Sequence, residues 1–249
     1  TELEKEQYDV AISEMEILKA IEESNNDKSP GLDGLPIEFY KTFWPDIKEY
    51  FMNFVINAKN KGELSLSQRH GLILLLPKKG KNNLLLKNWR PLTLLNQDYK
   101  IIAKVIGTRI KKLLSKIIHR DQTGFLSGRY IGENINRILN IIDYVENKQI
   151  KALLIFVDFE KAFDSIDWKF IVKALEYFNF SHEIIHWVKI IYSNISAMVQ
   201  NNGWISECFN LSRGVRQGCP LSPYLFTLCV ELLAIKSRNN KYIEGTSIN

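Results

Sequence analysis

The stretch Phe156-Val157-Asp158-Phe159-Glu160-Lys161-Ala162-Phe163-Asp164 decides how this 249-residue sequence is interpreted. It closes an apolar run, which predicts a buried strand over residues 153–159 with Asp158 at the edge of a sheet. A carboxylate there needs a cation or strong donors nearby, and Mg²⁺ accepts one or two such groups. The alternative is that Asp158 caps the following turn or pairs with Lys161. The exit turn carries three other acids, which are better explained as helix caps or solvated groups than as metal ligands: Glu160, Asp164 and Asp167.

A second informative stretch is Arg213-Gly214-Val215-Arg216-Gln217-Gly218-Cys219-Pro220. Its two glycines allow the backbone to approach a ligand closely, and Pro220 suits the first turn of a helix just beyond them. Exposed amides and a helix N-terminus favour an anion. Taken alone this pattern is weak, because many loops contain it.

Elsewhere, hydrophobic periodicity predicts many helices and a small sheet of mixed strands. Helices are expected after a capping box at residues 13–16 with Ile12 and Ile17 as its staple, from Pro36 with a break at Pro45, over 98–117, 133–145, 169–178 and 182–192, and from Pro220. Strands are expected over 72–76 and 89–95, and as a hairpin around Asn201-Asn202-Gly203. The pattern indicates an α+β or α/β domain with a helical lead-in.

The composition is that of a globular protein, with 45% hydrophobic and 24% charged residues. It excludes a disordered tail, a collagen-like repeat and a disulfide-stapled miniprotein. No apolar run approaches the roughly 18 residues of a membrane span, so no membrane association is expected. Three cysteines without a C-x-x-C pair indicate a reduced, intracellular protein without a zinc site.

Charge is unevenly distributed along the chain. Residues 1–68 hold 7 Lys and Arg against 14 Asp and Glu, a net of −7, whereas residues 69–129 hold 14 against 2, a net of +12. A basic block of this kind predicts a surface for a polyanion such as nucleic acid. A solvated helix face is the simpler alternative.

Five segments together resemble the reverse transcriptase domain of non-LTR (LINE-type) retrotransposons, in order and over nearly the whole chain. They are residues 26–34 (NDKSPGLDG), 76–80 with 88–96 (LPKKG and NWRPLTLLN), 122–129 (QTGFLSGR), 156–163 and 214–223. The resemblance implies an α+β right-hand polymerase fold. It divides the chain into a helical lead-in to the fingers over 1–68, basic fingers over 69–150 and a partial palm with two palm motifs over 151–249.

The resemblance also implies a reaction: RNA-directed DNA synthesis, in which a primer 3′-hydroxyl attacks a deoxynucleoside triphosphate with two Mg²⁺ ions, or Mn²⁺, at the site. Asp158 is similar to the first catalytic aspartate and metal ligand, and the Phe159 carbonyl would complete one coordination shell. Phe163 resembles the aromatic gate that excludes a ribose 2′-hydroxyl. The remaining nucleotide-binding positions are Lys78, Lys79, Arg90, Gln217 and Gly218.

The implied partners are an RNA template, a DNA primer and deoxynucleotides, and the nucleus is the compartment that the family implies. The cations assigned to template and primer are Lys100, Lys104, Arg129, Arg213 and Arg216. Such side chains grip phosphates independently of sequence.

The family's aromatic-x-Asp-Asp hairpin has no counterpart in this sequence. The last aspartate is Asp167, and residues 239–245 resemble the run that leads to that hairpin, so we expect a truncated domain that is inactive alone. Without the hairpin, the strand bearing Asp158 should be left as an unpaired apolar edge, and the chain should be marginally stable. Two alternatives stay open: a non-catalytic RNA-binding remnant and a mobile-intron-type reverse transcriptase.

Overall fold

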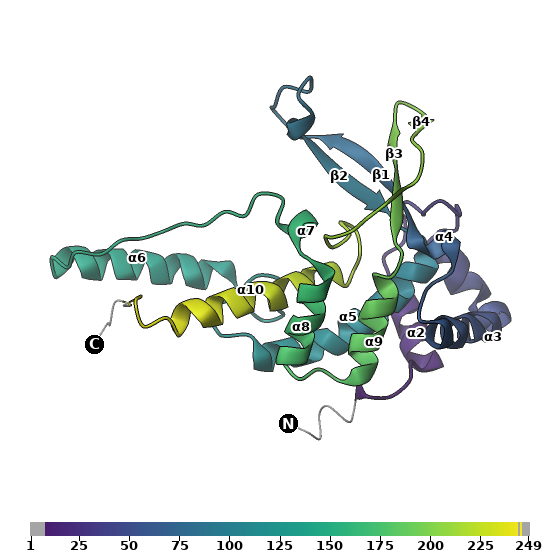
Figure 1. Ribbon diagram of the computed structural model, residues 1–249, viewed down its shortest axis with the longest axis horizontal. Helices are drawn as coiled ribbons and strands as arrows, with labels where there is room; N and C mark the ends of the chain where they lie inside the picture. Colours follow the sequence, from purple (N-terminus) through teal and green to yellow (C-terminus); the bar gives the residue numbers. More distant parts are fainter. Residues whose placement is uncertain (1–7, 244, 246–249) are drawn as a thin grey trace.

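The computed structural model describes residues 8–243 and 245 of the chain, and Figure 1 shows how they are arranged. In chain order the elements are α2 (Glu14–Glu22), α3 (Ile37–Lys61), α4 (Leu66–Arg69), β1 (His70–Pro77), η1 (Leu86–Asn88), β2 (Trp89–Leu94), α5 (Gln97–Ile117), α6 (Ile131–Asn147), α7 (Ala162–Ser165), α8 (Trp168–Tyr177), α9 (His182–Ile191), β3 (Ser196–Asn201), β4 (Trp204–Ile205), β5 (Phe209–Asn210) and α10 (Ser222–Arg238). The fold is mixed α+β, as predicted.

Within the described residues, the strands form one five-stranded sheet in the order β2-β1-β3-β4, with β5 also paired to β3. β1 runs antiparallel to β2, with Leu72 opposite Leu94, and parallel to β3, with Leu72 opposite Met198. The predicted hairpin is confirmed between β3 and β4. Its turn residues Asn202 and Gly203 both have positive φ, as a tight hairpin turn with matching twist requires.

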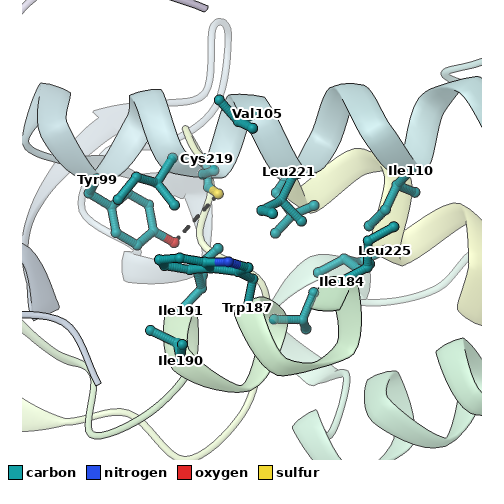
Figure 2. Packing of buried hydrophobic residues seen from close by; sticks show 14 of the residues in the cluster. Tyr99, Val105, Ile110, Ile184, Trp187, Ile190, Ile191, Cys219, Leu221 and Leu225 are labelled. Carbon is teal, nitrogen blue, oxygen red and sulfur yellow. Dashed lines mark hydrogen bonds between the residues drawn. The ribbon is translucent and has the colours of Figure 1, made fainter. Parts of the chain in front are cut away.

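Helices α5, α9 and α10 pack together in the part of the hydrophobic core that Figure 2 shows. Trp187 of α9 is fully buried there against residues of α5 and of the chain that enters α10. Buried Cys219 lies in the same cluster, where its Sγ accepts a hydrogen bond of 3.5 Å from the Tyr99 hydroxyl. This packing anchors the segment that follows the glycine-containing stretch, so the core positions the candidate site.

The predicted capping box of α2 is confirmed. The Ser13 hydroxyl accepts from the Glu16 amide at 3.3 Å, and the Ser13 amide donates to the Glu16 carboxylate at 3.0 Å. Ile12 and Ile17, the predicted staple pair, are both buried.

The expected helix break at Pro45 is wrong, because α3 continues from Ile37 to Lys61. Trp44 and Phe51, on either side of the proline, are buried and in edge-to-face contact with ring centroids 5.7 Å apart. Pro45 itself is exposed on the surface of the helix. Burial of the flanking aromatic rings outweighs the local penalty of proline.

The predicted strand over residues 153–159 is also wrong for the described chain, where this segment forms no strand. Its side chains are exposed, with Leu153 at 83% and Phe156 at 77%. A strand needs a neighbour to pair its N–H and C=O groups, and none of the five strands of the described sheet pairs with this segment. The apolar run over residues 153–159 therefore remains unpaired. This agrees with the expectation that the segment bearing Asp158 lacks the aspartate hairpin as a pairing partner.

Helix α6 projects away from the rest of the molecule, as Figure 1 shows. It matches the predicted helix over 133–145 with two more residues at each end, but none of its residues is buried. None of the helices in the described part of the chain combines the length and the apolar character needed to cross a membrane.

Candidate active site

The glycine-containing loop is fastened to the turn that follows the Asp158 segment. The Val215 amide donates to the Phe163 carbonyl and the Gly214 amide donates to the Ile166 carbonyl, both at 2.7 Å. Gly214 has φ +86°, and a Cβ at this position would lie 2.8 Å from the Asp164 carbonyl oxygen. Only glycine fits here, because both the backbone conformation and the close approach exclude a side chain.

The same loop also contacts strand β2. The Thr93 amide donates to the Gln217 carbonyl at 3.1 Å. Gly218 has φ +108°, and a Cβ there would lie 2.6 Å from the Thr93 carbonyl oxygen. The side-chain amide of Gln217 donates to the Asp164 carboxylate at 3.3 Å. Strand β2 thus holds the backbone of Gln217, and Asp164 holds its side chain.

These contacts enclose a cleft of about 330 Å³ between the sheet and the loop. Its lining residues come from β1, β2, α7, β5 and the loop: they include Ile73, Pro91, Thr93, Asp164, Arg213 and Gln217. Arg213 is exposed, and Asp164 is the carboxylate of the cleft. The cleft therefore brings together three of the predicted site residues: Arg213, Arg216 and Gln217.

Phe163 lies at the junction of the turn with the helices. Its ring stacks on Phe226 of α10 with centroids 4.6 Å apart and meets Phe125 edge-on at 6.2 Å. Two aromatic neighbours hold the ring in one orientation. An aromatic side chain fixed in this way can exclude atoms from the space beside it.

The chain's sequence matches the family model described as reverse transcriptase (RNA-dependent DNA polymerase) over residues 76–244, more than half of its length. The chain belongs to the reverse transcriptase family. This match includes both stretches from which the site is built.

Among known proteins, this reverse transcriptase domain is related to those of non-LTR retrotransposons. It is 38% identical over 231 residues to the uncharacterized 149 kDa protein of transposon TX1 from Xenopus laevis, covering 93% of this chain and 18% of that protein. It is 27% identical over 207 residues to the RNA-directed DNA polymerase from mobile element jockey of Drosophila melanogaster, covering 81% and 22%. A probable RNA-directed DNA polymerase from the X-element of the same organism is 25% identical over 216 residues, covering 86% and 24%. The chain thus spans less than a quarter of each of these relatives.

Asp158 lies on the exposed, extended segment before α7 and, within residues 8–243, makes no hydrogen bond or ion pair. Its carboxylate and the Phe159 carbonyl are hard oxygen donors of the kind that Mg²⁺ accepts. However, the described residues contain no group of three His, Cys, Asp or Glu side chains that could hold a metal ion. The family implies a divalent metal, and within the described residues Asp158 is not part of a group of three such side chains.

The basic residues near the strand ends differ in what they contact. Lys78 donates from Nζ to the Lys87 carbonyl at 2.9 Å, whereas Lys79 is exposed. Arg90 is exposed on β2 opposite Leu76. Lys79 and Arg90 therefore present cations to solvent, while Lys78 is engaged in closing the turn.

The five cations assigned to template and primer do not form one surface. Arg213 lines the cleft, but Arg216 is only 4% exposed and stacks over the Tyr99 ring at 5.1 Å. Arg129 donates to the backbone carbonyls of four residues: Ser115, Ile118, His119 and Gln122. In the described chain these contacts give Arg129 and Arg216 structural roles.

Lys100 and Lys104 lie half-buried on α5. Burial lowers the pKa of both side chains from its ordinary value. Each ammonium group has thus lost part of its hydration, which increases the benefit of an anionic partner.

Two side-chain contacts escaped the sequence analysis. Asp164, interpreted as a cap or solvated group, instead holds Gln217, whereas Asp167 does cap α8 by accepting from the Lys169 amide at 2.7 Å. Buried Arg109 joins α5 to the lead-in, because its guanidinium donates twice to the Glu16 carboxylate at 2.7 Å. The signal for this ion pair in the sequence is an arginine at a core position of an amphipathic helix.

Proposed function

We propose that this chain forms the fingers and part of the palm of an RNA-directed DNA polymerase of a non-LTR retrotransposon. The boundaries proposed for it are those expected above: 1–68, 69–150 and 151–249. Residues 1–7, 244 and 246–249 of these ranges lie outside the described residues. Part of the run over 239–245 that resembles the approach to the aspartate hairpin lies outside them as well.

The observation that carries the proposal is the double fastening of the glycine loop. Its bonds to the Phe163 turn and to Thr93 place Gln217 in a cleft that opens beside β2, where Arg90 is exposed. Arg90 and Lys79 would bind the triphosphate, since a guanidinium can engage phosphate oxygens in a bidentate manner. Phe163, fixed by Phe226, would exclude the 2′-hydroxyl of a ribonucleotide.

Asp158 and the Phe159 carbonyl would supply oxygen ligands to a divalent ion, which as a Lewis acid lowers the pKa of a primer hydroxyl. Further carboxylates would be needed beside them, because no group of three His, Cys, Asp or Glu side chains within the described residues could hold a metal ion. Gly218 and Gln217 would contact the nucleotide and the template base through the backbone and the amide.

The test is primer extension on poly(rA) with an oligo(dT) primer and Mg²⁺ or Mn²⁺. It compares this chain, the chain extended along its reading frame, and the extended chain carrying Asp158→Asn. Incorporation by the extended wild type and its loss in Asp158→Asn would support the proposal. An extended chain that folds and binds RNA but never incorporates nucleotides would favour the RNA-binding remnant instead.

A further inference from the structure

A second cleft, of about 580 Å³, lies along the face of α5 that its buried residues leave open. Its lining includes Lys19 of α2 with the C-cap residue Glu23, Lys104, Lys111 and Lys112 of α5, and Tyr224 of α10. None of its lining residues belongs to the cleft beside Gln217. It is therefore a separate feature of the surface.

The cleft carries an excess of positive charge. Four lysines face one acid, Glu23, whose carboxylate is 3.8 Å from Lys19. Lys104 donates only to the Ser24 hydroxyl, at 3.2 Å, and within residues 8–243 no ion pair joins Lys104, Lys111 or Lys112 to an acidic side chain. Burial lowers the pKa of Lys104, so this ammonium is already partly desolvated. An anion that enters the cleft meets cations whose charge the protein has not neutralised.

The spacing of these lysines suits a linear polyanion. Lys104 and Lys111 lie seven residues, or two helical turns, apart on one face, a rise of about 10 Å along α5. Lys112 widens the basic strip beside them. Hydroxyl groups that can donate to phosphate oxygens line the same cleft: Thr108, Ser115 and Ser127.

Tyr224 adds an aromatic surface to this basic strip. Its ring lies close to α5 because Gly107 has no side chain, and a Cβ there would lie 3.3 Å from the ring. Burial raises the pKa of the Tyr224 phenol, so the ring stays neutral at physiological pH. A half-buried aromatic ring beside a basic groove is how proteins hold unpaired bases, whose faces stack on the ring while lysines contact the backbone.

We propose that the cleft between α2, α5 and α10 binds single-stranded RNA, with Lys104, Lys111 and Lys112 on phosphates and Tyr224 under a base. The choice of nucleic acid over another polyanion rests on the proposed function. The site itself would hold a stretch of RNA outside the cleft beside Gln217.

The test is the binding of a short labelled single-stranded RNA to the chain, followed by fluorescence anisotropy over a range of KCl concentrations. The triple variant Lys104→Gln/Lys111→Gln/Lys112→Gln should bind at least ~10-fold more weakly. Its plot of log K against log salt should be shallower by about 2, at about 0.7 per lost phosphate contact. Tyr224→Leu should weaken binding about tenfold with little change of that slope.

A matched control triple, Lys61→Gln/Lys148→Gln/Lys236→Gln, removes the same charge from exposed positions outside the cleft and should bind nearly as the wild type does. The Lys→Arg version of the first triple keeps the three charges and should retain binding. Retained binding would show that the Gln triple binds weakly because it has lost charge and not because it has unfolded. Equal weakening by both Gln triples, or equal affinity for polyglutamate and RNA, would overturn the proposal. The assay contains no primer or nucleotide, so failure of the polymerase test leaves its result unaffected.

Discussion

At the scale of single residues, the candidate site depends on two glycines that bring separate elements into contact. Gly214 and Gly218 both have positive φ, and at each a Cβ would overlap a backbone oxygen of the neighbouring segment. Gly80, in the turn after β1, also has positive φ but faces open space. Comparing Gly218 with Gly80 therefore separates the destabilisation due to a left-handed backbone from that due to the close approach of a neighbouring segment.

Gly218→Ala should therefore lower the free energy of unfolding by more than Gly80→Ala does. The control substitution should cost about 1 kcal/mol for its left-handed backbone, and the Thr93 contact should add about 1–3 kcal/mol at Gly218. Urea denaturation of both variants measures the difference. Equal losses would show that the loop moves away from β2 without cost.

Phe163→Ala, in the chain extended along its reading frame, should raise the incorporation of ribonucleotides relative to deoxynucleotides by roughly tenfold or more. The reason is that the fixed ring would no longer fill the space that a 2′-hydroxyl requires. The ratio of the two kcat/KM values is the measurement, since a general loss of stability affects both substrates alike. An unchanged ratio would contradict the assignment of Phe163 as the side chain that excludes the ribose 2′-hydroxyl.

The Glu16–Arg109 pair predicts a pH dependence of stability. Burial alone would raise the pKa of Glu16, but hydrogen bonds from Arg109 and Ser13 outweigh it and hold that pKa below its ordinary value of 4.5. A lowered folded-state pKa means that the pair's contribution is complete above pH 4.5 and is lost as the pH falls below it.

Glu16→Gln should accordingly destabilise the chain at neutral pH and have a smaller effect in acid. Removing a charged hydrogen-bond partner of this kind costs about 2 kcal/mol. The unfolding free energy measured by denaturant at several pH values tests this. Lys48→Gln is the control, because its contact with Glu14 is exposed on both sides and should contribute little.

At the scale of elements, the extended segment over residues 153–159 has the composition of a strand but no partner in the described chain. At the end of this segment, Phe159 lines an apolar cleft of about 340 Å³ formed with residues of α7, α8 and α10. Exposed, β-prone apolar segments of this length associate readily with one another.

Ile155→Lys should therefore reduce self-association of the chain. Ile155 is 69% exposed, so the substitution removes no core contact and places a charge in the middle of the segment. Sedimentation velocity at several concentrations measures the change. Leu84→Lys is the matched control, because Leu84 is 91% exposed but lies outside the segment, and it should leave self-association unaltered.

At the scale of the whole molecule, the core is concentrated around α5 and α9, while α6 and residues 153–159 contribute no buried residue. This uneven burial means that a sizeable part of the chain is ordered with little apolar stabilisation. The molecule as a whole should be marginally stable.

We expect a thermal midpoint no higher than ~65 °C, the upper range for mesophile domains. Differential scanning calorimetry at low protein concentration measures it, with the scan repeated to check reversibility. A cooperative melt well above that range would contradict the prediction. It would also show that the exposed segments add more stability than their burial suggests.

Local patterns in the sequence were sufficient for the longer helices, the capping box, the β3–β4 hairpin and the membership in the reverse transcriptase family, because each depends on residues close together in the chain. Contacts between distant segments determined the rest. Pro45 stays within α3 because Trp44 and Phe51 are buried together, and residues 153–159 form no strand because none of the strands of the described sheet pairs with them. Arg216 and Asp164 acquired their partners in the same way, since burial and hydrogen bonding depend on what the folded chain places beside a side chain.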